Sequence, residues 1–168
     1  ASLRSHIPRV LSRIGGQEAV NILLDCLDEK DVHLRYKILK ALNRLRSSDV
    51  TLEFDKRKLL NPLFAELKQY YRYTQLLVSY NPSAPSSLDG GHRRYDLLTI
   101  SLLERQERAM ERLFRFMGLL YSHNDIHQAF YGLRSPRPQN RANTVEFLDI
   151  LLEPSLRKFI LPLIDNKL

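Results

Sequence analysis

The sequence predicts an all-α protein, a right-handed α-solenoid of antiparallel helix pairs with a long helical hairpin at its centre. A twelve-residue pattern occurs three times, in residues 3–14, 34–45 and 140–151, and the copies align without gaps. Apolar side chains within each copy are spaced by three and four residues, which is the spacing of one helix face. Helical units that recur in this way indicate stacked repeats. Sustained alternation of apolar and polar residues is missing, so we expect no strands.

Composition limits the size and setting of the chain. Of its 168 residues 43% are hydrophobic and only 6 are glycine, so it can bury one core and is expected to form a single domain, residues 1–168. Its apolar runs are far shorter than the about 20 residues that span a bilayer. The single cysteine, Cys26, lies among leucines and is expected in the core. With no disulfide pair and no signal-peptide pattern, the sequence favours a cytoplasmic location.

The first helix pair is predicted within the first 30 residues. Pro8 either kinks the helix over 3–14 or delays its start, and the Gly15-Gly16 pair ends it. A second helix is expected over 17–27. Its apolar face consists of Ala19, Val20, Leu23, Leu24 and Leu27.

A third helix begins after Asp31, whose side chain is expected to cap it, and ends near Ser47 and Ser48. Its predicted inner stripe consists of Leu34, Ile38, Ala41, Leu42 and Leu45. This helix holds the second copy of the twelve-residue pattern, so it should resemble the first helix in its packing.

Two much longer helices are predicted in the middle of the chain, over about 55–80 and 95–121. At 1.5 Å per residue each is about 40 Å long, and together they should form an antiparallel hairpin. The apolar stripe of the helix over 55–80 consists of Leu60, Leu63, Phe64, Leu67, Tyr71, Thr74, Leu77 and Val78. The apolar stripe of the helix over 95–121 consists of Leu98, Leu102, Ala109, Leu113, Phe116 and Leu120. Outward pairs four residues apart are expected between Glu104 and Arg108 and between Glu111 and Arg115.

The hairpin is joined by residues 81–94, which are rich in proline, glycine and serine and are predicted to be a flexible loop. After the hairpin we expect a short helix over about 125–133, the third repeat helix ending at Leu152, and a last helix over about 155–165.

Several of these motifs resemble HEAT repeats, a family of armadillo-type helical repeats. Asp31 before an apolar helix, with Arg35 four residues on and Ile38 after it, resembles the first helix of such a repeat. The order of the whole chain is similar to the cytoplasmic HEAT segment of bacterial membrane proteins related to ATP/ADP translocases. That narrower resemblance is carried by residues 41–46, 116–121, 132–135, 141–143 and 146–149. The general resemblance to HEAT repeats covers about half the chain and rests on a loose motif. Thr144, in place of an apolar residue, and the long hairpin depart from a regular array of such repeats.

This resemblance implies a non-catalytic scaffold for protein–protein or interdomain contacts. Asp31, Arg35 and Arg141 are then expected to make structural contacts between repeats, with no catalytic residue, cofactor or metal. The partners would be other domains of the same polypeptide or another protein. In the translocase-related family the segment follows a membrane domain and often precedes a cyclic-nucleotide-binding domain, so we expect apolar spans upstream and a small ligand-binding domain downstream.

Signals for enzyme chemistry are weak. His123 and His127 lie four residues apart, as two metal ligands on one helix face would, but no third ligand is evident. Ser122 and Asp125 are residues that commonly begin helices, which gives the segment a structural interpretation. The glycine pairs lack the lysine and hydroxyl residue of a phosphate loop. We therefore expect no enzymatic activity.

The chain is basic, with 26 lysine and arginine residues against 19 acidic ones. Tyr70, Tyr71, Arg72 and Tyr73 form a candidate basic and aromatic surface on which bases could stack. A nucleic-acid-binding HEAT module, of which the helical-repeat DNA glycosylases are one type, is therefore the alternative function. An anionic membrane surface is another candidate partner. A solvated helical surface with no ligand explains the same charge.

Overall fold

The computed structural model describes residues 3–80 and 97–165, and these form helices without a strand. The all-α class is therefore confirmed for the described residues. The elements are η1 (Leu3–Ser5), α1 (Ile7–Ile14), α2 (Gly16–Asp25), α3 (Val32–Ser48), α4 (Lys56–Ser79), α5 (Leu97–Leu120), α6 (His123–Gly132), α7 (Pro138–Leu151) and α8 (Pro154–Asp165). The loop predicted over 81–94 lies outside the described residues.

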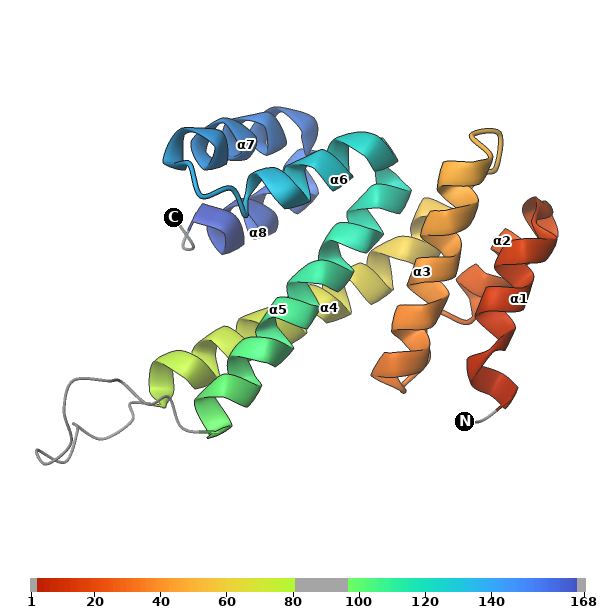
Figure 1. Cartoon of the computed structure of the whole chain (residues 1–168), viewed down its shortest axis with the longest axis horizontal. Coiled ribbons are helices and arrows are strands. Elements are labelled where there is room, and N and C mark those ends of the chain that lie inside the picture. Colours follow the sequence, from red (N-terminus) through yellow and green to blue (C-terminus); the bar gives the residue numbers. More distant parts are fainter. Residues whose placement is uncertain (1–2, 81–96, 166–168) are drawn as a thin grey trace, which may run out of the picture.

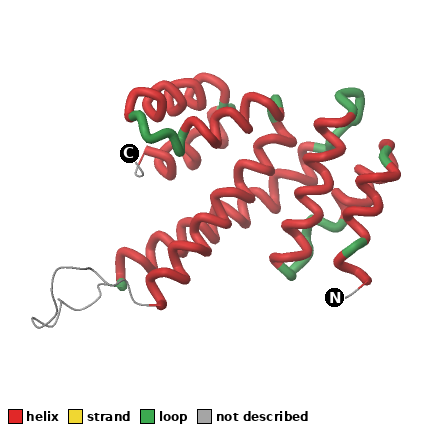
Figure 2. Tube along the Cα trace, viewed as in Figure 1, coloured by secondary structure: helices red, strands yellow, loops and turns green. Residues whose placement is uncertain are grey.

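The hairpin of α4 and α5 runs diagonally through the molecule, as the two longest helices lying side by side (Figure 1). Helices α1 to α3 lie at one end, and α6 to α8 lie on the other side of the hairpin. Short loops and turns join the remaining helices (Figure 2). Within the described ranges no helix combines the length and the apolarity needed to cross a membrane.

Two consecutive glycines produce the turn between α1 and α2. Gly15 and Gly16 have φ values of 79° and 81°, in the left-handed region that side chains rarely adopt. The Gly15 N–H donates to the Leu11 carbonyl at 3.0 Å, which closes the last turn of α1. The predicted helix stop is confirmed, and α1 begins late, at Ile7, with Pro8 in its first turn.

The start and inner face of α3 follow the sequence prediction. Asp31 caps the helix, because its carboxylate accepts from the backbone N–H of His33 at 2.9 Å and of Leu34 at 3.4 Å. The predicted inner residues are all buried, and Leu39 joins them. Helix α3 packs against both α1 and α5. It thus connects the N-terminal helices to the hairpin.

In α1 the predicted orientation is wrong. Ile7 and Ile14 occupy the apolar positions of the repeat, yet both are exposed, and the buried residues are Pro8 and Ser12. Spacing defines an apolar stripe but does not say which helix will cover it. Here α2 and α3 pack against the other side of α1, where small side chains allow a close approach.

The buried stripe of α4 departs from the prediction at several positions. Leu59 and Leu63 are fully buried, and Val78, predicted on the apolar stripe, is 79% exposed near the end of the helix. Phe64 and Tyr71 are 37% and 38% exposed. This outer row faces α8: the Phe64 ring lies edge-on to Phe159 at 5.8 Å, and the Tyr71 hydroxyl donates to the Phe159 carbonyl at 2.9 Å. Apolar residues on two adjacent rows allow either row to be the core row, and neighbouring helices decide between them.

Two further burial predictions fail. Cys26 is exposed, because α2 ends at Asp25 and the cysteine follows as its C-cap, in a turn rather than on the apolar face. Leu98 is exposed on the first turn of α5, whereas Leu102, Ala109 and Leu113 further along the same stripe are buried. Both exceptions lie at helix ends, where side chains have fewer neighbours.

A cluster of three charged residues joins α3, α4 and α5; Glu66 and Arg112 are buried, and Arg35 is partly buried. Glu66 of α4 is 1% exposed and accepts from Arg35 of α3 and from Arg112 of α5, each through Nε at 3.0 Å. Because the carboxylate contacts both neighbouring helices, it fixes α4 against them. Buried charges of this kind are stable only when they are paired and hydrogen-bonded.

Candidate functional site

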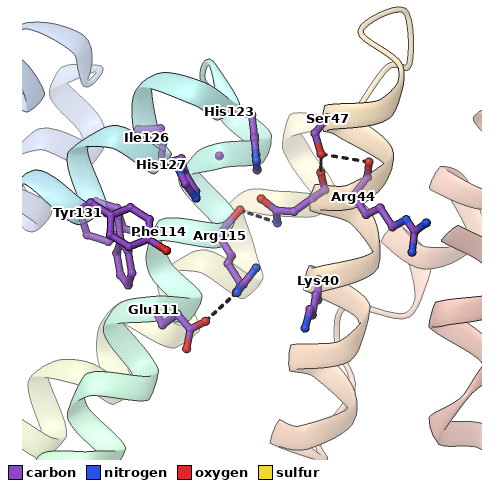
Figure 3. A pocket seen from close by; sticks show the side chains of 13 residues that line it. Lys40, Arg44, Ser47, Glu111, Phe114, Arg115, His123, Ile126, His127 and Tyr131 are labelled. Carbon is purple, nitrogen blue, oxygen red and sulfur yellow. Dashed lines mark hydrogen bonds and ion pairs between the residues drawn. The ribbon is translucent and has the colours of Figure 1, made fainter.

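A cavity of about 360 Å³ lies where α3, α5 and α6 meet (Figure 3). Lys40 and Arg44 come from α3, Arg115 from α5, and His123 and His127 from α6. Glu111 is the lining residue with a carboxylate. The cavity is therefore a basic site built from segments far apart in the sequence.

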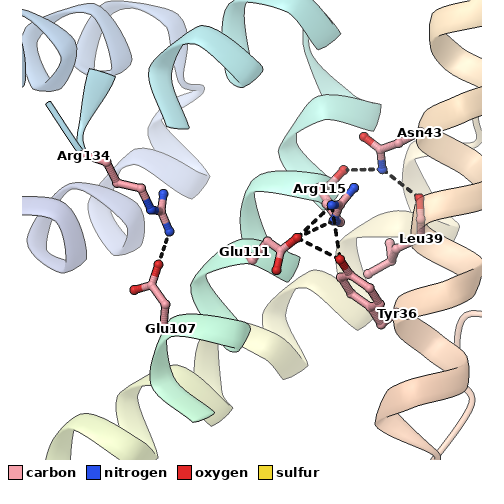
Figure 4. Close-up of polar contacts among 7 residues, drawn as sticks. All are labelled: Tyr36, Leu39, Asn43, Glu107, Glu111, Arg115 and Arg134. Carbon is pink, nitrogen blue, oxygen red and sulfur yellow. Dashed lines mark hydrogen bonds and ion pairs between the residues drawn. The ribbon is translucent and has the colours of Figure 1, made fainter. Parts of the chain in front are cut away.

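Arg115 is held in place by a small network next to the cavity (Figure 4). Its Nη2 donates to Glu111 Oε1 at 2.7 Å and to the Tyr36 hydroxyl at 3.3 Å, and its guanidinium lies 5.1 Å from the centre of the Tyr36 ring. The Tyr36 hydroxyl donates to the same Glu111 oxygen at 2.9 Å. Three contacts thus limit the movement of this guanidinium.

The ionisation of the network follows from these contacts. Burial raises the pKa of Tyr36, and the hydrogen bond to Glu111 raises it further. Burial also raises the pKa of Glu111, but hydrogen bonds from Arg115 and Tyr36 outweigh that effect, and the net pKa is lowered. Near neutral pH the site therefore holds a neutral phenol between a carboxylate and a guanidinium.

The floor of the cavity is a close approach of three helices at Gly118. A Cβ atom at this glycine would lie 3.1 Å from Asn43 Oδ1 and 3.3 Å from His123 Nδ1. Asn43 is itself fixed, because its Nδ2 donates to the carbonyls of Leu39 at 2.8 Å and Arg115 at 3.1 Å. The glycine lets α3 and α6 close over α5.

His123 is the first residue of α6 and faces a positive environment. Burial lowers its pKa, and the charges of His127, Arg115 and Arg46 lower it further. Its Nδ1 is buried and has no hydrogen-bond partner within the described ranges. Burial is thus the main cause of the lowered pKa, and the neighbouring positive charges add to it.

Aromatic rings form the opposite part of the lining. The Phe114 and Phe130 rings lie 5.1 Å apart, and His127 lies 4.8 Å from Tyr131. The guanidinium of Arg134 lies 3.5 Å from the centre of the Phe130 ring. The cavity therefore combines a cationic side with an aromatic side.

The residues expected to join repeats, Asp31, Arg35 and Arg141, do not line this cavity. Asp31 caps its own helix, as described above. Nη1 of Arg35 donates to the Glu29 carbonyl at 2.8 Å, in addition to the contact with the buried glutamate. Nη1 of Arg141 donates to the Ser135 carbonyl at 2.9 Å. These side chains stabilise the turns before their helices.

The tyrosine-rich tract does not form a continuous surface. Tyr70 is 3% exposed, and burial, together with the nearby charge of Glu107, raises its pKa to about 12. Tyr73 packs partly against the core, and Tyr71 is tied to α8. Arg72 is exposed. Bases therefore cannot stack on Tyr70, and the predicted basic and aromatic surface loses one of its three tyrosines.

The two histidines noted in the sequence lie together in the cavity, with ring centres 6.2 Å apart. The described part of the chain holds no group of three side chains suited to a metal ion. The sequence did not reveal the cavity, because Lys40 and Arg115 are far apart along the chain. In the sequence Arg115 stands out only as one half of a pair with Glu111, four residues apart.

A second feature is an apolar stripe on the outer face of α1 and η1. The exposed fractions are 83% for Leu3, 48% for Ile7, 53% for Val10 and 73% for Ile14. Ile7, Val10 and Ile14 follow one another by three and four positions, so they lie along one side of α1, and Leu3 precedes them in η1. Helix α1 lies at one end of the molecule (Figure 1).

The cavity between α3, α5 and α6 and the apolar stripe of α1 and η1 are the two features that bear on function. No protein-family model, no curated protein and no solved structure matches the chain.

Proposed function

We propose that this chain is a non-catalytic helical-repeat scaffold, a HEAT-like right-handed α-solenoid that binds another protein domain. The apolar stripe of Leu3, Ile7, Val10 and Ile14 carries the proposal. Exposed apolar rows of this kind mark interaction sites, since removing them from water is favourable.

The internal repeat explains why the stripe exists. Ile38 and Leu45 of α3 occupy the repeat positions of Ile7 and Ile14, and both are buried between neighbouring helices. The corresponding positions of α1 have no covering helix among the described residues. A stack of repeats buries its apolar faces by adding units side by side. A further helix packed on α1 would extend the stack in the same way.

The chemistry of the stripe indicates the kind of partner. Its spacing alternates four and three residues, which suits a narrow seam against one amphipathic helix. Arg9 and Arg13 are exposed on α1 beside the stripe. The partner helix should therefore carry an apolar row flanked by acidic residues.

We further propose that the partner helix belongs to another domain of the same polypeptide, and that the chain is a cytoplasmic connector or regulatory domain of a transporter-like membrane protein. The motifs that resemble translocase-related HEAT segments support this context. The excess of basic residues also suits a location beside anionic lipid headgroups.

Site-specific photocrosslinking in the full-length polypeptide tests the scaffold. A benzophenone side chain is placed at Val10 on the stripe and, as the matched control, at Arg9, which is exposed on the same helix but off the stripe. We expect the Val10 position to crosslink to one helix of another domain, mapped by mass spectrometry, and the Arg9 position to give little product. Equal crosslinking, or none from Val10, would contradict the proposal.

A nucleic-acid-binding module is the alternative. The basic cavity favours it, but the burial of Tyr70 removes part of the stacking surface on which it depended. We expect binding to a single-stranded oligonucleotide to be weak and to fall steeply with salt concentration. Tight, sequence-selective binding at physiological salt, measured by fluorescence anisotropy, would make this alternative the better account.

A further inference from the structure

We propose that the cavity between α3, α5 and α6 binds a small organic phosphate, with the phosphate group held by Lys40, Arg44 and Arg115 and the organic group packed against the aromatic side. This is a binding site separate from the apolar stripe of α1. It therefore stands or falls independently of the scaffold.

Uncompensated positive charge is the first argument. Lys40 and Arg44 are exposed on one side of α3, four residues apart, and within the described ranges neither is in an ion pair or a hydrogen bond through its side chain. Together with Arg115 they give the cavity lining three cations and one carboxylate, from Glu111. In Figure 3 Lys40 lies on the side of α3 that faces Arg115, whereas the Arg44 guanidinium is turned to the far side of α3 and has to rotate to reach the cavity. A bound anion would relieve the repulsion among these positive charges.

The amount of charge suits a phosphate monoester. Three cations and one carboxylate leave two positive charges, and the lowered pKa of His123 keeps that histidine neutral near pH 7. A phosphate monoester carries nearly two negative charges at that pH. A carboxylate ligand would neutralise only half of the excess.

Pre-organisation is the second argument. Arg115 is fixed by Glu111 and Tyr36 through Nε and Nη2, so its Nη1 takes no part in that network. A guanidinium already held in one orientation loses little freedom when it binds an anion. Figure 3 shows Arg115 and Glu111 on the wall of the cavity that faces the α3 side chains.

Size and lining define the rest of the ligand. A volume of about 360 Å³ lies at the small end of ligand pockets, which run from about 300 to 1,000 Å³. Phe130 and Tyr131 offer ring faces and edges for an apolar or aromatic group. Two of the neutral polar groups are occupied elsewhere, since the Asn43 amide and the Ser47 hydroxyl donate to backbone carbonyls. Charge and aromatic contact should therefore dominate recognition.

Phenyl phosphate is the probe that matches this description, with inorganic phosphate as its anionic half and benzyl alcohol as an uncharged aromatic control. Binding to the chain is measured by isothermal titration calorimetry and by NMR chemical shifts at low salt. We expect saturable binding of phenyl phosphate with a Kd below about 1 mM, weaker binding of inorganic phosphate, and no binding of benzyl alcohol at about 10 mM.

Charge-removing variants test the location of the site. The double variant Lys40→Gln/Arg44→Gln should weaken phenyl phosphate binding at least about tenfold. Lys37→Gln is the matched control, because Lys37 is exposed on the same helix but does not line the cavity, and its Kd should change less than about twofold. All three side chains are exposed, so circular dichroism should show unchanged folding.

Several results would overturn the proposal. One is the absence of saturable binding by the wild-type chain; another is an equal loss of affinity in the Lys37 and Lys40/Arg44 variants, which would reveal only a general charge effect. Binding of benzyl alcohol as tight as that of phenyl phosphate would reveal an apolar site. Binding of a single-stranded oligonucleotide with none of phenyl phosphate would assign the charge to nucleic acid.

Discussion

Arg35 and Arg141 make the same hydrogen bond in two different helices. Nη1 of Arg35 donates to the carbonyl of Glu29 at 2.8 Å, and Nη1 of Arg141 donates to the carbonyl of Ser135 at 2.9 Å. Each acceptor lies six residues before its arginine, and each arginine lies four residues after the N-cap of its helix. The sequence repeat that aligns the two arginines therefore corresponds to a repeated local structure.

The two arginines differ in the hydrogen bonding of their second donor, Nε. Nε of Arg35 donates to buried Glu66, whereas Nε of Arg141 is buried without a hydrogen-bond partner in the described part of the chain. Helix α3 also has a side-chain cap from Asp31, and α7 has none. The local turn is thus repeated, but of these two arginines only Arg35 also hydrogen-bonds to a neighbouring helix within the described residues.

The first prediction concerns the buried cluster of Glu66 with Arg35 and Arg112. Glu66→Ala leaves both arginines without their carboxylate, so the free energy of unfolding should fall by about 3 to 5 kcal/mol. Glu104→Ala is the control, since that carboxylate pairs with Arg108 on the surface and should contribute less than about 1 kcal/mol. Urea denaturation measures both. Similar losses for the two variants would show that the buried cluster is not a special source of stability.

The second prediction concerns the cap of α3. Asp31→Ala removes the acceptor for two backbone N–H groups, and we expect a loss of about 0.5 to 2 kcal/mol in the free energy of unfolding. Asp28→Ala removes an exposed carboxylate in the preceding turn and should change it by less than about 0.5 kcal/mol. An unchanged urea midpoint for Asp31→Ala would mean that water replaces the cap without cost.

The third prediction concerns the packing of α6 on α7. A Cβ atom at Gly132 would lie 2.3 Å from Thr144 Oγ1, so Gly132→Ala should cost about 1 to 3 kcal/mol despite its better helix propensity. Thr144→Ala removes the clashing hydroxyl. The double variant should therefore lose less stability than the sum of the two single variants, by about 1 kcal/mol or more. Additive losses in a double-mutant cycle would show that the helices shift apart instead.

The same contact explains one departure from the repeat pattern. Thr144 stands where the first two copies have isoleucine, and the sequence alone offered no reason. In the structure the threonine packs on Gly132, and its hydroxyl donates to the Asn140 carbonyl at 2.7 Å. An isoleucine at this position would lose that hydrogen bond.

Sequence reasoning predicted the helices well and their surroundings less well. Helix spacing depends on neighbours three or four residues apart, so α2 to α5 appear where expected, and the Asp31 cap is a local signal as well. Which stripe is covered depends on other helices, and this is why Ile7 and Phe64 were placed wrongly. The cavity depends on Lys40, Arg115 and His123 meeting in space, and no local pattern contains that information.

The last prediction uses the pH dependence of stability to test the environment of His123. Burial, followed by the charges of His127, Arg115 and Arg46, lowers the pKa of this histidine in the folded chain. In the unfolded chain the pKa returns to about 6.5. As the pH falls below that value, the unfolded chain takes up a proton that the folded chain does not. The free energy of unfolding therefore decreases until the pH passes the folded pKa, and below it this contribution stays constant.

His123→Gln removes this titration, so its stability should fall less than that of the wild-type chain between neutral and mildly acidic pH. His33→Gln is the control, because His33 is exposed on α3 and away from the cavity, and its pH profile should follow the wild type. Urea denaturation at a series of pH values gives the slopes. A steeper fall for His123→Gln than for the wild type would mean that protonation of His123 stabilises the fold, and that the potential at this end of the cavity is negative.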